Sequence, residues 1–162
     1  MVLFLHLASS IVPRGFGLRD DMVYRALKFR STLNNATGGA ANYLFLGDLN
    51  SMGLEYPYSH DIGASNELKR WDRRSGYYDM KRLSNTYDVS WFNGSGFSIP
   101  DCNLDHVYAA KHLTFKNLRG PARIITAVDV RGRVDKTTSA SKDQWISKYS
   151  DLSLLYLEVQ RV

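Results

Sequence analysis

The sequence predicts an α/β protein with a mixed β-sheet and helices on one face of that sheet. Two observations lead to this class. Short β-favouring segments alternate along the chain with a segment of helical periodicity, and 44% of the 162 residues are hydrophobic, which is enough for a buried core. The single cysteine excludes disulfide scaffolds and Cys-rich zinc modules. Because 162 residues suit a single domain, we expect one domain over residues 1–162, with no internal linker.

The N-terminal part of the chain predicts a strand followed by a helix. Residues 2–7 favour β-structure, and the Pro/Gly-rich residues 12–18 predict a loop. Asp20 or Asp21 can then cap a helix that ends at about Leu33. Apolar residues recur along that helix at intervals of three or four: Leu18, Met22, Ala26, Phe29 and Leu33.

The rest of the chain predicts further strands around a long irregular region. Residues 43–46 are continuously apolar and predict a short strand buried on both faces. Residues 51–100 predict mostly irregular structure, with a short helix near residues 67–71, and a loop of that length is typical of binding loops. Regular structure returns in three predicted strands, residues 104–110, 124–130 and 154–159, and in one predicted helix, residues 142–148.

The charge of the chain favours anionic partners. The 21 Lys and Arg residues against 16 Asp and Glu residues give a net charge of +5, which suits phosphate esters or nucleic acid. Within residues 67–82, basic and aromatic side chains gather, and Arg70, Trp71, Arg73 and Arg74 are candidate nucleic-acid contacts. The alternative interpretation is a solvated surface segment whose aromatic rings are tucked onto the core.

Nothing in the sequence indicates a membrane segment. The apolar run that opens the chain lacks a basic leader and is broken at His6, unlike a signal peptide. No apolar stretch reaches the roughly 20 residues that a spanning helix needs. We expect a cytoplasmic chain with no membrane partner.

The segment Gly47-Asp48-Leu49-Asn50 directly follows the apolar run at residues 43–46. Gly47 allows the backbone to turn tightly there. In an extended segment, Asp48 and Asn50 point the same way, and together they present a carboxylate and an amide, which suit a hard cation or a phosphate. A plain turn is the alternative interpretation, because Asp, Asn and Gly are all turn formers.

Other polar residues stand at predicted strand ends. Asp105 opens the strand at residues 104–110, and His106 beside it faces the opposite side. Asp151 lies between the last predicted helix and strand, and His6 lies near the end of the first strand. Taken alone, each has an ordinary structural interpretation.

In this order, the segments resemble the endonuclease/exonuclease/phosphatase superfamily, which includes the pancreatic-type deoxyribonucleases, the apurinic-site endonucleases and the inositol-phosphate phosphatases. The family signature Gly-Asp-x-Asn matches residues 47–50, and its Leu-Asp-x-hydrophobic strand matches residues 104–107. Its Ser-Asp-His element is matched by residues 150–152, and its His-Leu strand end with an Arg-bearing helix is matched by residues 6–7 and 19–33. The resemblance covers nearly the whole chain.

The resemblance implies hydrolysis of a phosphodiester or phosphomonoester with Mg²⁺ or Mn²⁺, the cation neutralising charge that develops in the transition state. It implies that Asp48 and Asp151 bind the metal and that Asp48 contacts the attacking water. Asn50 and His6 would hold the phosphate, and Asp105 would orient a catalytic histidine. We expect the side chains of the aspartates and Asn50 to meet in one acidic pocket.

The chain also departs from the family pattern. Leu152 replaces the histidine of the Ser-Asp-His element, and leucine can neither transfer a proton nor bind a phosphate. The family's first half, with an asparagine and a metal-binding glutamate, has no match, so we expect a partial domain, the C-terminal half of a four-layer sandwich. Mg²⁺ or Mn²⁺ should then bind weakly if at all, and phosphoesterase activity should be impaired. The alternative function is a non-catalytic remnant that binds nucleic acid or a protein partner.

Half of such a sandwich would leave one face of its sheet uncovered. Apolar residues at alternating strand positions are the candidates for that face: Leu3, Leu5, Leu44, Leu46, Leu155 and Leu157. We expect a homodimer, or a partner chain, to cover the exposed sheet face.

Overall fold

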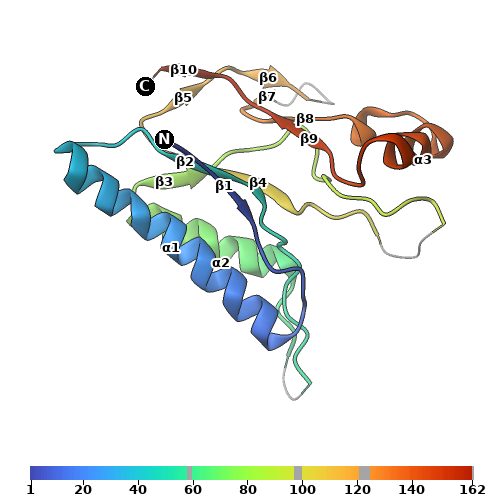
Figure 1. Ribbon diagram of the computed structural model, residues 1–162, viewed down its shortest axis with the longest axis horizontal. Coiled ribbons are helices and arrows are strands. Elements are labelled where there is room, and N and C mark those ends of the chain that lie inside the picture. The colour runs from blue at the N-terminus through green and yellow to red at the C-terminus, as the bar shows by residue number, and fades with distance from the viewer. Residues whose placement is uncertain (58–59, 97–99, 121–124, 162) are drawn as a thin grey trace. The chain divides into compact units, whose positions relative to one another are not determined.

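The computed structural model describes residues 1–57, 60–96, 100–120 and 125–161 (Figure 1). The chain divides into two compact units. The first unit comprises Met1–Arg82 and His106–Leu113, and the second comprises Leu83–Asp105 and Thr114–Arg161. Helices and a mixed sheet confirm the predicted α/β class.

The first unit holds a four-stranded sheet in the order β1-β2-β4-β3. Its strands are β1 (Val2–His6), β2 (Leu44–Asp48), β3 (Met80–Arg82) and β4 (Asp105–Ala110). β1 and β2 are parallel, whereas β3 runs antiparallel to β4. The sheet is therefore mixed, and β1 forms one of its edges.

Two helices, α1 (Pro13–Thr37) and α2 (Ala64–Tyr77), cover one face of this sheet (Figure 1). α1 is the crossover that joins the parallel strands β1 and β2. The hydrophobic core between helices and sheet consists of Leu7, Val23, Ala26, Leu27, Tyr43, Phe45, Leu49, Trp71, Met80 and Tyr108. Because β1 and β2 are parallel neighbours, the loops that follow them leave the sheet at the same edge.

α1 begins earlier than the sequence predicts. Pro13 occupies the first turn, where its missing N–H leaves no helical hydrogen bond unmade, so the loop predicted for residues 12–18 is largely helix. The predicted apolar face is wrong at Leu18 and Met22, which are 49% and 41% exposed, and is confirmed at Ala26, Phe29 and Leu33, which lie in or against the core. The buried stripe includes Arg19 and Arg30 beside Val23, Ala26 and Leu27. Two buried arginines interrupt the apolar pattern by which the buried side of a helix is predicted.

In the described residues, the second unit consists of short antiparallel strand pairs and a helix. β5 (Thr114–Phe115) pairs with β10 (Val159–Arg161), β6 (Leu118–Arg119) with β7 (Ile125–Thr126), and β8 (Asp129–Arg131) with β9 (Leu154–Tyr156). α3 (Ser139–Lys148) follows the 3₁₀ turn η2 (Arg133–Asp135). Thr138 begins α3 with a capping box. Within the described parts of both units, no helix is long and apolar enough to cross a membrane.

Several predicted elements differ in extent. α2 contains the helix predicted near residues 67–71 but is longer, and β3 lies in the region predicted to be irregular. The strand predicted at residues 124–130 contains β7 and β8, and Ile124 lies outside the described residues. The strand predicted at residues 154–159 is divided into β9 and β10. β3, β8, β9 and β10 each pair with a segment that is distant in the sequence, and local propensity does not encode such pairing.

The residues expected on the uncovered sheet face are partly wrong. Leu3 and Leu5 pack against the helical core, and Leu44 is 4% exposed. Those that are half-buried are Leu46, Leu155 and Leu157. In β1 the alternate set faces solvent, with Val2 51% and Phe4 74% exposed, because the helices cover the side that carries Leu3 and Leu5.

Candidate functional site

His6 and Asp48 meet at the carboxyl ends of β1 and β2. In the register of these parallel strands the two residues are partners, so their side chains lie on the same face of the sheet. His6 Nε2 is 3.6 Å from Asp48 Oδ2, and the side chains are 78% and 13% exposed, respectively. The site thus offers solvent an imidazole, which can carry a proton, beside a carboxylate, which can bind a cation.

β2 ends at Asp48, and the turn that carries the chain out of the sheet at Leu49 and Asn50 depends on Gly47 before it. Gly47 has a φ of 133°, and a Cβ there would collide with the carbonyl oxygen of Leu5 in β1. Asn50 has a φ of 49°, a left-handed conformation that asparagine tolerates better than most residues. The backbone is therefore extended as far as Asp48 but not at Asn50, so the extended geometry expected for residues 48–50 is wrong at Asn50.

Hydrogen bonds attach this turn to the end of β1. Leu7 N–H donates to the carbonyl of Asp48 at 2.9 Å, and Asn50 Nδ2 donates to the carbonyl of Leu7 at 2.9 Å. Asn50 N–H donates to Asp48 Oδ1, also at 2.9 Å. Asn50 is 2% exposed. Its amide therefore holds the loop in place beside His6 and Asp48, and it presents little surface to a ligand.

Ser51 and His106 form a second polar pair next to this turn. Ser51 Oγ and His106 Nε2 are 2.8 Å apart, and the residues are 3% and 1% exposed. A hydroxyl beside an imidazole is the pattern of an activated nucleophile, but burial keeps a substrate away from this hydroxyl. The pair connects β4 to the loop after β2. Sequence reasoning missed it, because the two residues are 55 positions apart and no motif joins them.

Asp105, the first residue of β4, is grouped with the second unit, as is Asp151, and both contact the segment formed by Ser90 and Trp91. Asp105 N–H donates to Ser90 Oγ at 3.0 Å, and Trp91 Nε1 donates to Asp151 Oδ2 at 2.9 Å. Leu152, which stands where the resemblance requires a histidine, forms a β-bridge with Trp91. The structure thus brings the two aspartates to one short segment, whereas their convergence with the first-unit residues stays a prediction.

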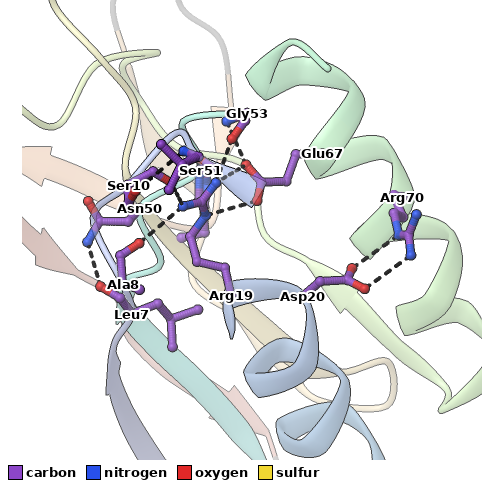
Figure 2. Close-up of polar contacts among 12 residues, drawn as sticks. Leu7, Ala8, Ser10, Arg19, Asp20, Asn50, Ser51, Gly53, Glu67 and Arg70 are labelled. Carbon is purple, nitrogen blue, oxygen red and sulfur yellow. Dashed lines mark hydrogen bonds and ion pairs between the residues drawn. The ribbon is translucent and has the colours of Figure 1, made fainter. Parts of the chain in front are cut away.

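A buried ion pair between Arg19 and Glu67 supports the loops that follow β1 and β2 (Figure 2). Both side chains are 0% exposed, and Arg19 Nε donates to Glu67 Oε1 at 2.9 Å. Arg19 also donates to the carbonyls of Ala8 and Ser10 after β1, and to that of Gly53 after β2. Gly53 N–H in turn donates to Glu67 Oε2 at 2.8 Å. One arginine therefore connects the two loops that border the candidate site.

Burial and hydrogen bonding act in opposite directions on the pKa of Glu67. Burial raises the pKa of Glu67, while the hydrogen bonds from Arg19 and from Gly53 N–H oppose that shift. No local pattern predicts this pair, because Arg19 and Glu67 are 48 positions apart in the sequence. Their role is visible only once α1 and α2 pack side by side.

The basic side of α2 carries three of the four expected nucleic-acid contacts. A shallow depression of about 260 Å³ on this side is lined by Arg70, Arg73, Arg74 and Tyr77. Asp20 of α1 lies 3.1 Å from Arg70 and 2.7 Å from Arg74, which lowers the charge available to a ligand. Trp71 is 0% exposed, so its expected contact with nucleic acid is wrong: its position on the helix turns its ring into the core.

The donors present determine how the implied metal ion could be held. Among the described residues, no three side chains of the types His, Cys, Asp and Glu gather closely enough to hold a metal ion. The exposed site in the first unit has one carboxylate, Asp48, beside His6. Mg²⁺ is commonly held by one or two carboxylates together with substrate phosphates. These donors fit a cation that binds together with a phosphate ester, and they do not fit a tightly held resident ion.

Three of the expected site residues, His6, Asp48 and Asn50, therefore lie together in the first unit, with Asn50 in a structural position. No family model, no curated protein and no solved structure matches this chain. What the site does follows from its own residues.

Proposed function

We propose that this chain is a phosphoesterase-type domain that binds a phosphate ester at His6 and Asp48 and hydrolyses it slowly or not at all. The observation that carries the proposal is the approach of His6 Nε2 to Asp48 Oδ2, 3.6 Å apart, where β1 and β2 end. Ligands of open α/β sheets commonly bind outside the carboxyl ends of the strands. A protonatable imidazole and a carboxylate at that edge suit a phosphate that is accompanied by a divalent cation.

Each side chain would take a distinct part. Protonated His6 would bind a phosphate oxygen or stabilise the leaving group. Asp48 would hold Mg²⁺ or Mn²⁺, which when bound neutralises charge on the phosphate. Asn50 would keep the turn closed, because its amide already donates to the carbonyl of Leu7.

Slow hydrolysis follows from Leu152. A positioned general acid or base typically contributes ~10²–10⁴-fold to a rate, and a leucine side chain can act as neither. Asp105 has no histidine at position 152 to orient. The chain should therefore still bind the ester, although it cleaves the ester slowly or not at all.

A non-catalytic binding domain is the second candidate function. Leu152 and the buried amide of Asn50 both favour it, since neither can act on a substrate. A phosphate-bearing partner such as nucleic acid would then bind without turnover. The two candidates share the binding step and differ only in hydrolysis, so the two steps need separate tests.

Binding is tested by NMR on the histidine imidazoles. We expect inorganic phosphate or a phosphodiester, added with Mg²⁺, to shift the resonances of His6 and to leave those of the exposed His112 unchanged. Asp48→Ala should remove the Mg²⁺ dependence of that shift, whereas Asp21→Ala, an exposed carboxylate on α1, should not. The absence of a His6 response to phosphate would contradict the proposed site.

Calorimetry tests the expectation that the free chain binds Mg²⁺ weakly. Tight, stoichiometric Mg²⁺ binding would contradict that expectation.

Hydrolysis is tested on plasmid DNA, RNA and a nitrophenyl phosphodiester with Mg²⁺ or Mn²⁺. We expect rates at the blank level. Leu152→His alone should not restore activity, because the family's remaining catalytic groups have no match in the sequence. A rate clearly above the blank that Asp48→Ala removes would show that the chain is an active phosphoesterase instead.

A further inference from the structure

A second candidate binding surface lies on α3. A depression of about 330 Å³ is lined by Lys136, Ser141, Gln144, Trp145, Lys148 and Tyr149. All six residues belong to the second unit. An inference from this surface, called here the α3 surface, therefore does not rest on the proposed function of His6 and Asp48.

The helical spacing gathers aromatic and basic groups on one side of α3. Ser141, Trp145 and Lys148 are four and three positions apart, so they project from the same side. Tyr149, at the C-cap, lies four positions after Trp145, and the two ring centroids are 4.4 Å apart with a tilt of 40°. Tyr149 is 62% exposed. The two rings form one aromatic surface at the end of the helix.

Trp145 is held in position from the loop before α3. Gly132 has a φ of 98°, and the six-membered ring of Trp145 occupies the space that a Cβ at this position would need. The indole Nε1 is buried and has no hydrogen-bond partner among the described residues. Buried N–H groups are rarely left unpaired. The close contact with Gly132 holds the ring in a fixed position, as a stacking surface for a base requires.

Ammonium groups border the two rings. Lys136 Nζ lies 5.1 Å from the centroid of Trp145, and Lys148 Nζ lies 5.3 Å from that of Tyr149. Cation–π contacts at exposed sites are weaker than the stacking of a nucleobase on an aromatic ring. A base can therefore displace the ammonium group of Lys148 from the ring of Tyr149, and the flexible lysine stem can then reach a neighbouring phosphate.

We propose that the α3 surface binds single-stranded nucleic acid, with bases stacked on Trp145 and Tyr149 and phosphates contacted by Lys136 and Lys148. Proteins that bind single strands combine aromatic stacking surfaces with cationic groups that follow the backbone. A duplex keeps its base faces stacked inside, and an anion without a base gains nothing from the rings. Binding should tolerate changes of base, because every base has a face that stacks.

The test is fluorescence anisotropy of labelled DNA and RNA single strands of about six nucleotides, titrated with the full chain. We expect saturable binding that weakens with salt, with a slope of roughly −0.7 for each phosphate contacted. Trp145→Ala should weaken binding about ten-fold or more, since stacking of one base is lost. Lys148→Glu should weaken binding and reduce the salt slope by about 0.7. A duplex of the same sequence and a mononucleotide should bind more weakly than the single strand.

Matched variants keep the test specific. Lys28→Glu makes the same charge change at an exposed position of α1, and Arg73→Glu makes it on the basic side of α2. Neither variant should weaken nucleic-acid binding as much as Lys148→Glu. Tyr149→Ala removes an exposed ring without opening the core, so it tests stacking even if Trp145→Ala fails to fold. Unchanged affinity in Tyr149→Ala and Lys148→Glu, or loss of binding in Arg73→Glu alone, would overturn the proposal. Equal affinity for inorganic polyphosphate would also overturn it, because the rings would then contribute nothing.

Discussion

Arg19 is the residue on which the shape of the loops beside His6 and Asp48 depends. Its guanidinium donates to backbone carbonyls of both loops and to Glu67, and all of it is buried. Removal of one partner from a buried ion pair commonly destabilises a fold by about 3–5 kcal/mol, because the other charge is left unpaired. We expect Arg19→Met to lower the free energy of unfolding at neutral pH by that order, measured by urea denaturation.

The size of this loss should depend on pH in one direction. Burial raises the pKa of Glu67, and the Arg19 substitution removes an interaction that lowers it. A carboxyl whose pKa is raised in the fold contributes its full stability below the ordinary value of 4.5, and that contribution is lost as the pH rises through the raised pKa. Measured against the unmodified chain at each pH, Arg19→Met should therefore lose less stability near pH 5 than near pH 7.

Two further variants separate electrostatics from packing. The double variant Arg19→Met with Glu67→Gln has no buried charge at these positions, so it should recover part of the stability lost at neutral pH. Arg25→Met removes an arginine whose ion pair with Asp21 is exposed, so it should leave stability nearly unchanged. Equal losses at both pH values, without recovery in the double variant, would show that the unpaired carboxylate is not the cause.

Some of the site's residues could be predicted from the sequence, and others could not. His6 and Asp48 stand at the ends of locally predictable strands, and the resemblance linked them before the register placed them together. Asn50 was expected to hold a phosphate, but its left-handed backbone turns the amide toward Leu7. The contact between Ser51 and His106 joins distant segments, so no local pattern reveals it.

At the scale of elements, Gly47 fixes how β2 leaves the sheet beside β1. Its φ of 133° and its close approach to Leu5 leave no room for a side chain. We expect Gly47→Ala to destabilise the chain by about 1–3 kcal/mol. The amide resonances of residues 2–6 should shift because β1 must move, which NMR spectra of the variant will show.

A second glycine gives the matched control. Gly17 lies inside α1 with open space around the position of a Cβ. Gly17→Ala should therefore stabilise the chain by roughly 0.5–1 kcal/mol through helix propensity. If Gly47→Ala were as well tolerated as Gly17→Ala, the junction of β1 and β2 would not depend on the glycine.

Some elements could be predicted from the local sequence pattern, and others could not. β1 and β2 consist of β-favouring residues, and they form close to the predicted residues 2–7 and 43–46. The start of α1 was misassigned because proline and glycine favour loops on average, although the first turn of a helix accepts proline. The first turns of the buried side of α1 were misassigned, and Arg19 and Arg30 were missed because Glu67 and Asp79, which neutralise them, come later in the chain. β3 has three residues and depends on its pairing with β4, which propensity does not report.

At the scale of the whole chain, the two units carry different chemistry for ligands of one class. The first unit presents an imidazole and a carboxylate, which suit a phosphate ester, and the second presents stacked rings with lysines, which suit bases and their phosphates. A net charge of +5 favours the approach of any such polyanion to either unit. Nucleic acid has the chemistry that both proposals require.

The edge of the sheet in the first unit predicts self-association. β1 is an edge strand, and its Val2 and Phe4 are 51% and 74% exposed. An edge strand with exposed apolar side chains readily pairs with another chain. Across a two-fold axis, β1 can pair antiparallel with β1 of a second copy, so that the same apolar residues of each copy become covered. We therefore expect a homodimer at micromolar concentration, measured by light scattering after size-exclusion chromatography.

Substitutions test whether β1 forms the interface of this dimer. Phe4→Lys places a charge at the centre of β1 and should convert the dimer to a monomer, because a charge on an edge strand opposes pairing. Tyr77→Lys, at a position 80% exposed on α2, makes the same substitution away from the strand and should leave the dimer intact. A monomeric unmodified chain would mean that two exposed side chains on β1 are too small a surface to bind a second copy. A dimer that survives Phe4→Lys would place the interface on another surface of the chain.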